Sequence, residues 1–186
     1  MTRGSFALNS SNRIRIGTLG RISAQKDPGR FCEVIKRLGN SSKLDFIWVG
    51  DGQPCEDSEL RENNVNVTGW LNRNEALEIM STFDIYLQTS RWEGMPLALI
   101  EAALLKVPVV TTDILGNRDV VNHKVTGFVA EDSDGLVSAL EELIGSENLR
   151  HTMGEAARSL AVDRFGVARL EKEIISLYSA RQPLAA

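Results

Sequence analysis

Short apolar runs alternate with amphipathic stretches along most of the chain. The apolar runs are four to six residues long and predict strands at residues 14–19, 44–49, 65–68, 85–88, 107–111 and 127–130. The intervening and following stretches predict helices at residues 28–38, 55–62, 73–81, 96–105, 134–144, 147–162 and 167–179. Continuously apolar strands that alternate with helices are typical of a parallel sheet covered on both faces. The pattern therefore predicts an α/β fold with a doubly wound parallel sheet.

The two ends of the chain differ in pattern from the middle. Residues 1–12 are rich in serine and asparagine, which indicates a linker, an expression leader or the end of a cut between domains. We expect one ordered domain over residues 13–186, including the C-terminal helices. In the last helix Leu170, Ile174 and Tyr178 fall close to helical spacing, so we expect one face of this helix to be packed, as an ordinary core-facing stripe would be.

Composition and charge exclude several classes of protein. The chain is 42% hydrophobic and 25% charged, which is ordinary for a globular domain, and its net charge of −4 argues against general binding to nucleic acid. It lacks the run of about 18 to 20 apolar residues that a membrane span needs, and residues 1–12 lack the apolar centre of a signal peptide. Cys32 and Cys55 are far apart and have no histidine nearby, so we expect reduced thiols, no metal site and a cytoplasmic protein.

One stretch combines carboxylates with a turn that opens a helix. The sequence S-R-W-E-G-M-P-L-A-L-I-E-A at residues 90–102 places Glu93 and Glu101 eight positions apart. Pro96 suits the first helical position, and Gly94 lets the backbone approach a ligand closely. A helix start of this kind binds phosphate through free amides and the helix dipole. With carboxylates on either side to accept from hydroxyl groups, the stretch fits a nucleotide sugar.

Structural interpretations of the same carboxylates stay open. Glu93 could be an acid that caps the helix, and Glu101 could be the ion-pair partner of Arg21 or Arg91, because buried charges are usually paired. Either carboxylate would then be explained without a ligand.

The residues that follow the predicted strands should meet along one edge of the sheet, where ligands of open parallel sheets bind. Arg21 and Lys26 follow the first strand, and there they could reach a diphosphate at the helix start. Individually such cations are more often solvated surface residues. The chain has neither G-x-G-x-x-G after the first strand nor G-x-x-x-x-G-K-[ST], so a dinucleotide cofactor or a P-loop is not indicated.

As a set, these motifs resemble the C-terminal, nucleotide-sugar-binding half of a family 4 retaining glycosyltransferase with the GT-B fold. The resemblance covers residues 13–179 and is carried by G-R-I-S-A-Q-K-D at Gly20, W-V-G-D-G at Trp48, V-T-G-W-L at Val67, the stretch at residues 90–102, and V-P-V-V-T-T-D at Val107. It implies a Rossmann-like domain that forms one half of a GT-B enzyme.

The resemblance also implies roles for individual residues. Arg21 and Lys26 would bind the donor diphosphate, Glu93 the hydroxyls of the donor sugar and Glu101 the ribose. Backbone amides around Gly94, Met95, Pro96 and Leu97 would meet phosphate and sugar, and Trp70 and Leu71 would lie beside the base. Arg21, Lys26 and Glu93 would be the catalytic residues, with Glu93 orienting the sugar rather than forming a covalent bond.

The chain departs from the family pattern at three places. Lys106 stands where the family often has glycine, and a left-handed conformation there would cost about 1 kcal/mol. Leu115-Gly116 replaces a Gly-Gly pair, and Asp119 replaces a glutamate. These changes concern loop shape and reach, and no donor-binding position is lost.

The resemblance implies transfer, with retention, of a sugar such as a hexose from UDP-, GDP- or ADP-sugar, without metal or cofactor. The acceptor would be bound by an N-terminal domain absent from this chain, present in cis or as a separate subunit, so we expect this domain to be inactive alone. Two alternatives stay open: a nucleotide-sugar-binding module without catalysis, and part of a sugar-nucleotide epimerase. We expect neither a nucleic acid partner nor a membrane span.

Overall fold

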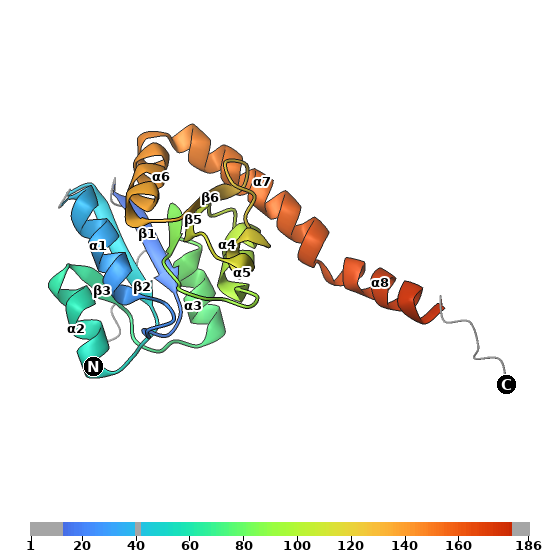
Figure 1. Cartoon of the computed structure of the whole chain (residues 1–186), viewed down its shortest axis with the longest axis horizontal. Helices are drawn as coiled ribbons and strands as arrows, with labels where there is room; N and C mark the ends of the chain where they lie inside the picture. Colours follow the sequence, from blue (N-terminus) through green and yellow to red (C-terminus); the bar gives the residue numbers. More distant parts are fainter. Residues whose placement is uncertain (1–12, 40–41, 180–186) are drawn as a thin grey trace.

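The core of the protein is one parallel sheet. The structure is a computed structural model that describes residues 13–39 and 42–179 (Figure 1). The expectations for residues 1–12, and for 180–186 as part of the domain, lie outside the described residues. The sheet has six strands in the order β3-β2-β1-β4-β5-β6, and every neighbouring pair is parallel. The strands are β1 (Ile14–Leu19), β2 (Leu44–Val49), β3 (Val65–Val67), β4 (Ile85–Gln88), β5 (Val109–Thr112) and β6 (Gly127–Ala130).

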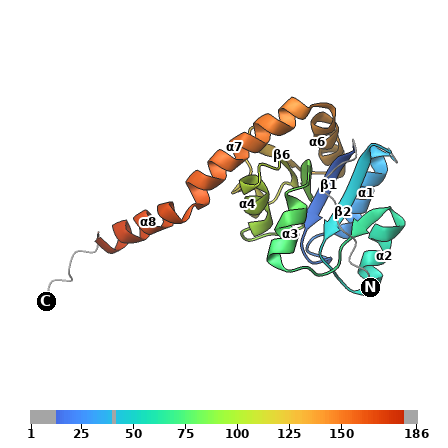
Figure 2. The same cartoon turned by 180° about the vertical axis from the view of Figure 1, so that it is seen from behind.

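Helices cover both faces of this sheet (Figures 1 and 2). They are α1 (Pro28–Leu38), α2 (Pro54–Glu62), α3 (Arg73–Met80), α4 (Leu97–Leu104), α5 (Leu115–Arg118), α6 (Ser133–Gly145), α7 (Glu147–Phe165) and α8 (Val167–Ser179). Side chains of α1, α2 and α6 share one buried cluster with the strands, and side chains of α3 and α4 share the other. The prediction of an α/β, doubly wound parallel sheet is confirmed.

The segment between α4 and β5 differs from the prediction. Lys106 has a φ of 62°, and the amide of Val107 donates to the carbonyl of Ala102 at 2.9 Å. These two residues close the end of α4, so β5 begins at Val109 and not at residue 107. Lys106 thus has the left-handed conformation whose cost the sequence analysis considered.

The first turn of α1 fixes the loop that carries Lys26. Asp27 precedes the helix with a φ of 51°, and its side chain accepts from the amide of Arg30. Pro28 then occupies the start of the helix, where its missing N–H costs nothing. The loop after β1 therefore ends at a defined point above the sheet.

The last two helices leave the body of the domain. Met153, Ala157 and Ala161 anchor α7, whereas α8 extends away from the sheet and has no buried residue (Figures 1 and 2). The side chains of Leu170, Ile174 and Tyr178 are 44% to 73% exposed. The expectation of a packed, core-facing stripe is therefore not met by the described part of the chain.

Candidate functional site

The loops that carry the predicted site residues meet where the strand order reverses. β1 and β4 are neighbours at the centre of the sheet, and the chain continues outward from them in opposite directions. Ligands of open α/β sheets bind in the crevice at such a point, beyond the carboxyl ends of the strands. The loop after β1 carries Arg21 and Lys26, and the loop after β4 carries Glu93 and Gly94.

Lys26 and Glu93 form a sheltered ion pair at this point. The Lys26 Nζ lies 2.7 Å from the Glu93 Oε1, and the two side chains are 16% and 8% exposed. The same Oε1 accepts from the Ser90 hydroxyl at 2.8 Å, and the Oε2 accepts from the Gln25 Nε2 at 3.3 Å. Glu93 is therefore not a capping acid of α4, because its carboxylate faces the loop after β1.

A second ion pair joins the same two loops. The Arg91 Nε donates to the Asp27 Oδ2 at 2.8 Å, and the Arg91 amide donates to the Gln25 carbonyl at 2.8 Å. Burial by itself would raise the pKa of the Asp27 carboxyl, but the hydrogen bonds from Arg91 and from the Arg30 amide outweigh it, so this pKa lies below its usual value. The pair fixes the spacing of the loops on either side of Lys26.

A hollow of about 350 Å³ opens beside this cluster. Its walls come from the ends of the first three strands and from α3: Leu19, Gly20, Arg21, Val49, Gly50, Asp51, Trp70, Leu71 and Ala76. The indole of Trp70 is 74% exposed and offers an open aromatic face. The loops after β1, β2 and β3 therefore do lie along one edge, as the sequence predicts.

Gly20 links the hollow to the ion pair. Gly20 has a φ of 148°, and a Cβ added to it would lie 2.8 Å from the Lys26 Cε. Residue 20 must therefore be glycine to leave room for the Lys26 side chain, which passes the edge of the hollow there. Arg21 is exposed and, among the described residues, has no ion-pair partner. Arg21 thus lines the hollow, while Lys26 lies between it and the turn at Gly94.

The start of α4 differs by one residue from the prediction. Pro96 precedes the helix as its N-cap and is not its first residue, and no side chain caps the helix. The Leu99 amide is the first to bond back, to the Pro96 carbonyl at 3.0 Å. Within the described chain the amides of Leu97 and Ala98 have no hydrogen-bond partner. The side chains of Met95 and Leu97 are exposed around them.

Glu101 has a different partner from either arginine considered in the sequence analysis. The Arg73 Nη2 and Nε both donate to the Glu101 Oε1, at 2.8 and 3.1 Å. Arg21 does not contact Glu101, and Arg91 pairs with Asp27. In the described part of the chain the Glu101 Oε2 accepts no hydrogen bond, so one oxygen of this carboxylate is free.

The structure thus brings the predicted residues together in two adjoining groups. Arg21, Trp70 and Leu71 line the hollow, and Lys26, Glu93 and the start of α4 form the neighbouring cluster. Sequence reasoning missed Arg73, although it follows the third strand, the same kind of position that pointed to Arg21 and Lys26 after the first. It also missed the partnership of Asp27 with Arg91, which no spacing in the sequence indicates.

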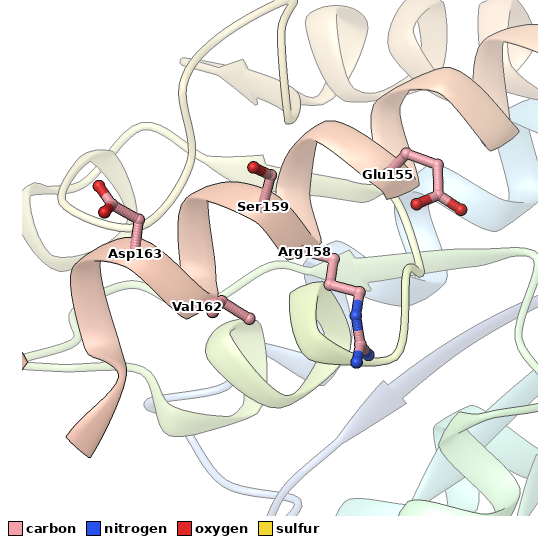
Figure 3. Close-up of a pocket in the computed structure, with 5 residues that line it drawn as sticks. All are labelled: Glu155, Arg158, Ser159, Val162 and Asp163. Atoms are coloured by element: carbon pink, nitrogen blue, oxygen red, sulfur yellow. The ribbon is translucent and has the colours of Figure 1, made fainter. Parts of the chain in front are cut away.

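Another hollow, of about 470 Å³, lies along α7. Figure 3 shows that its lining side chains all project from this one helix: Glu155, Arg158, Ser159, Val162 and Asp163. It is remote in sequence and fold from the loops described above and gathers no groups from several elements. We therefore place the functional site at the carboxyl edge of the sheet.

The described residues, 13–39 and 42–179, contain no group of three or more histidine, cysteine, aspartate or glutamate side chains placed to hold a metal ion. In the same part of the chain no helix has both the length and the apolar character needed to cross a membrane.

Comparison with known proteins places this chain in a family. The family described as glycosyl transferases group 1 matches residues 5–160. The chain is 29% identical over 172 residues to the UDP-Gal:alpha-D-GlcNAc-diphosphoundecaprenol alpha-1,3-galactosyltransferase of Escherichia coli, covering 86% of this chain and 44% of that protein. The chain therefore spans less than half the length of this relative.

Solved structures share the fold. A variant of Staphylococcus aureus TarM, crystallised with fondaparinux, alpha-GlcNAc-glycerol and UDP, superposes with a TM-score of 0.81 at 19% identity, over 97% of this chain and 38% of that one. Anabaena HepE in complex with UDP-glucose superposes with a TM-score of 0.78 at 23% identity, over 91% of this chain and 50% of that one. Together with the family match, the sheet order and the resemblance of the sequence motifs, these findings show that the chain belongs to the group 1 glycosyl transferases and has the Rossmann-like fold of one half of a GT-B enzyme.

Proposed function

We propose that this chain is the donor-binding half of a retaining glycosyltransferase that takes a sugar from a nucleoside diphosphate sugar. The observation that carries the proposal is the Lys26 ammonium, held 2.7 Å from Glu93 between the hollow at Arg21 and the uncapped start of α4. A cation, an open aromatic face and free helix amides at one edge match the phosphate, base and sugar parts of such a donor.

The diphosphate would lie between Lys26 and α4. An ammonium has three N–H groups. Lys26 donates one of them to Glu93, so two remain for phosphate oxygens. The amides of Leu97 and Ala98 and the positive end of the helix dipole would face the same oxygens, and Arg21 would approach from the hollow. As the bond to the sugar breaks, these groups stabilise the charge that builds on the departing diphosphate.

The nucleoside would occupy the hollow. Trp70 and Leu71 line it, and the base would lie beside them. Arg73 fixes one oxygen of Glu101, and the free Oε2 would accept from a ribose hydroxyl. A volume of about 350 Å³ lies within the range of small-ligand sites, which is about 300 to 1,000 Å³.

Glu93 would orient the donor sugar. Its Oε1 is already shared by Lys26 and Ser90, and its Oε2 has a single, longer contact from Gln25, so the Oε2 is the oxygen available to a sugar hydroxyl. A carboxylate neutralised in this way is a poor nucleophile, which favours orientation over covalent catalysis. Retention of the anomeric configuration, which the resemblance implies, is part of this proposal.

The acceptor would be bound by a second domain that faces this edge. Because the chain spans 44% of the length of its Escherichia coli relative, we propose that an N-terminal acceptor domain, in cis or as a separate subunit, completes the enzyme. The exposed apolar face of α8 would pack against that domain. We also propose a cytoplasmic location, because Cys32 is a buried free thiol of the kind that reducing compartments preserve.

Calorimetric titration of the chain with UDP, GDP and ADP, and with a glucose or mannose ester of each, tests this function. We expect one nucleotide to bind, its sugar ester to bind more tightly, and the chain alone to neither transfer the sugar nor isomerise it when the mixture is followed by NMR. Absence of binding by every nucleotide at millimolar concentration would contradict the proposal. Isomerisation of the sugar nucleotide would favour the epimerase alternative.

A further inference from the structure

A chain of buried hydrogen bonds runs from α5, past the end of β5, to the carboxylate of Glu93. It starts at Asn117 on α5, a short helix that the sequence did not predict, and passes through Thr112 and Ser90. Each of these three residues is at most 2% exposed. None of them belongs to the donor-binding groups named above.

Asn117 is held on both sides of its amide. Its Nδ2 donates to the Thr111 Oγ1 at 2.6 Å and to the carbonyl and hydroxyl of Thr112 at 3.0 and 3.3 Å. Its Oδ1 accepts from the Gln88 Nε2 at 2.9 Å. Because the Thr112 carbonyl can only accept, the orientation of the Asn117 amide is fixed, and the ends of β4 and β5 are tied together.

The route continues to the loop that carries Glu93. The Thr112 hydroxyl donates to the Ser90 carbonyl at 2.6 Å, and the Ser90 hydroxyl donates to the Glu93 Oε1 at 2.8 Å. Gly116, the preceding residue of α5, packs directly against the same loop. A Cβ added to it would lie 2.5 Å from the Gly94 carbonyl and 2.6 Å from the Glu93 carbonyl. The turn at Glu93 and Gly94 thus packs against α5.

The network is poorly suited to stabilising the fold alone. The Gln88 Oε1 is buried and has no hydrogen-bond partner in the described chain, and an unpaired buried acceptor costs about 1 to 3 kcal/mol. Apolar side chains of similar size would hold β4 and β5 together at least as well. A polar chain that ends on a functional carboxylate is better explained by the position it gives that carboxylate.

We infer that Asn117 is a positioning residue, which acts through Thr112 and Ser90 to hold Glu93 in the orientation that receives the donor sugar. This inference rests on the proposed function of Glu93. Asn117 itself touches no part of the donor.

Two neighbouring threonines provide a matched test. Thr111 and Thr112 are both buried in β5 and both accept from Asn117, but only Thr112 donates to Ser90. Thr111→Val and Thr112→Val therefore make the same chemical change, and only the second breaks the route to Glu93. The measured quantity is the ratio of the affinities for UDP-glucose and UDP, obtained by calorimetry, because a loss of general stability does not change this ratio.

We expect Thr112→Val to lower the ratio by about tenfold, as far as Glu93→Gln does, and the double variant to lower it no further. Thr111→Val should keep the wild-type ratio, and Asn117→Ala, if it folds, should behave like Thr112→Val. Equal losses in the two threonine variants would overturn the inference and leave a structural role only. If the ratio falls in Glu93→Gln but not in Thr112→Val, the inference is overturned and the proposed function is left intact. If the ratio is unchanged in Glu93→Gln, both are overturned.

A second measurement needs no ligand. In two-dimensional NMR spectra of the free chain, Thr112→Val should shift the backbone amide signals of Glu93 and Gly94 more than Thr111→Val does. Equal shifts would contradict the proposed route.

Discussion

Three carboxylates at the edge of the sheet each have a cation as partner before any donor binds. The pairs are Asp27 with Arg91, Glu93 with Lys26, and Glu101 with Arg73. The three carboxylates are 8% to 18% exposed, so removing the cation would leave each of them unpaired in a partly buried place. The arrangement therefore supplies donor-binding groups that are already oriented.

Removal of the phosphate-facing cations is the first expected loss. Lys26→Ala should weaken UDP binding by about tenfold or more, and Arg21→Ala by a smaller factor because Arg21 is exposed and its charge is screened by solvent. Calorimetry with UDP checks both. Lys172→Ala on α8 is the control, since it removes a surface cation remote from the hollow, and an affinity for UDP that is unchanged in both test variants would count against the site.

Asp27 should make folding stability depend on pH. The pKa of Asp27 in the folded protein is below its usual value of 3.8. The charged carboxylate therefore contributes fully to the free energy of unfolding above pH 3.8, and this contribution is lost as the pH falls through the lowered pKa of the folded state. Asp27→Asn keeps an oxygen for the Arg30 amide and tolerates a φ of 51°.

The difference in free energy of unfolding between wild type and Asp27→Asn should be about 1 kcal/mol at neutral pH and should shrink as the pH falls below 3.8. Urea denaturation at several pH values measures it. A difference that stays constant over this range would show that the charge of Asp27 has no part in stability.

The sequence was sufficient to identify Arg21, Lys26 and Glu93 as neighbours, because parallel strands bring the loops after them to one edge. It was not sufficient to pair the charges. The sequence analysis considered Arg21 and Arg91 as partners of Glu101, but Arg73 of α3 bonds to it, because the pairing depends on how α3 packs relative to α4. Asn117 gave no signal at all, because a buried asparagine looks like a loop residue until its partners are known.

Helix ends, more than helix interiors, shape the site. The closure of α4 at Lys106 and Val107 displaces the start of β5, and α5 supports the turn before α4. The strands β1, β2, β4 and β6 and the helices α1 and α8 have the predicted bounds, because apolar period and caps define them. α5 was missed because its four residues are too few to show a helical period.

The contact of α7 with the end of α4 leaves no room for a side chain at Gly154. A Cβ on Gly154 would lie 2.1 Å from the Lys106 carbonyl, so Gly154→Ala should lower the free energy of unfolding by about 1 to 3 kcal/mol. Gly145→Ala at the end of α6 meets nothing within 4 Å and should change it by less than about 0.5 kcal/mol. Urea denaturation of both variants checks this, and similar values for the two would show that α7 is not packed as described.

The molecule as a whole is a packed sheet with one unpacked helix. No residue of α8 is buried, whereas α7 contributes Met153, Ala157 and Ala161 to the interior. The sequence predicts the apolar face of α8, but only the structure shows that the described part of the chain leaves that face uncovered.

Truncation after Phe165 should therefore leave the domain stable. We expect the free energy of unfolding to change by less than about 0.5 kcal/mol, because no residue of α8 is buried. Truncation after Arg150, which also removes Met153, Ala157 and Ala161, should destabilise the domain by several kcal/mol and is the matched comparison. Thermal unfolding followed by circular dichroism measures both, and a large loss in the shorter deletion would mean that α8 packs on the sheet in solution.

A crystal structure of the chain with UDP-glucose tests the donor site most directly. We predict phosphate oxygens about 3 Å from the Lys26 Nζ and from the first free amides of α4, with the base beside Trp70 and the glucose next to Glu93. A nucleotide bound elsewhere on the molecule, or a diphosphate in contact with neither Lys26 nor α4, would contradict this prediction.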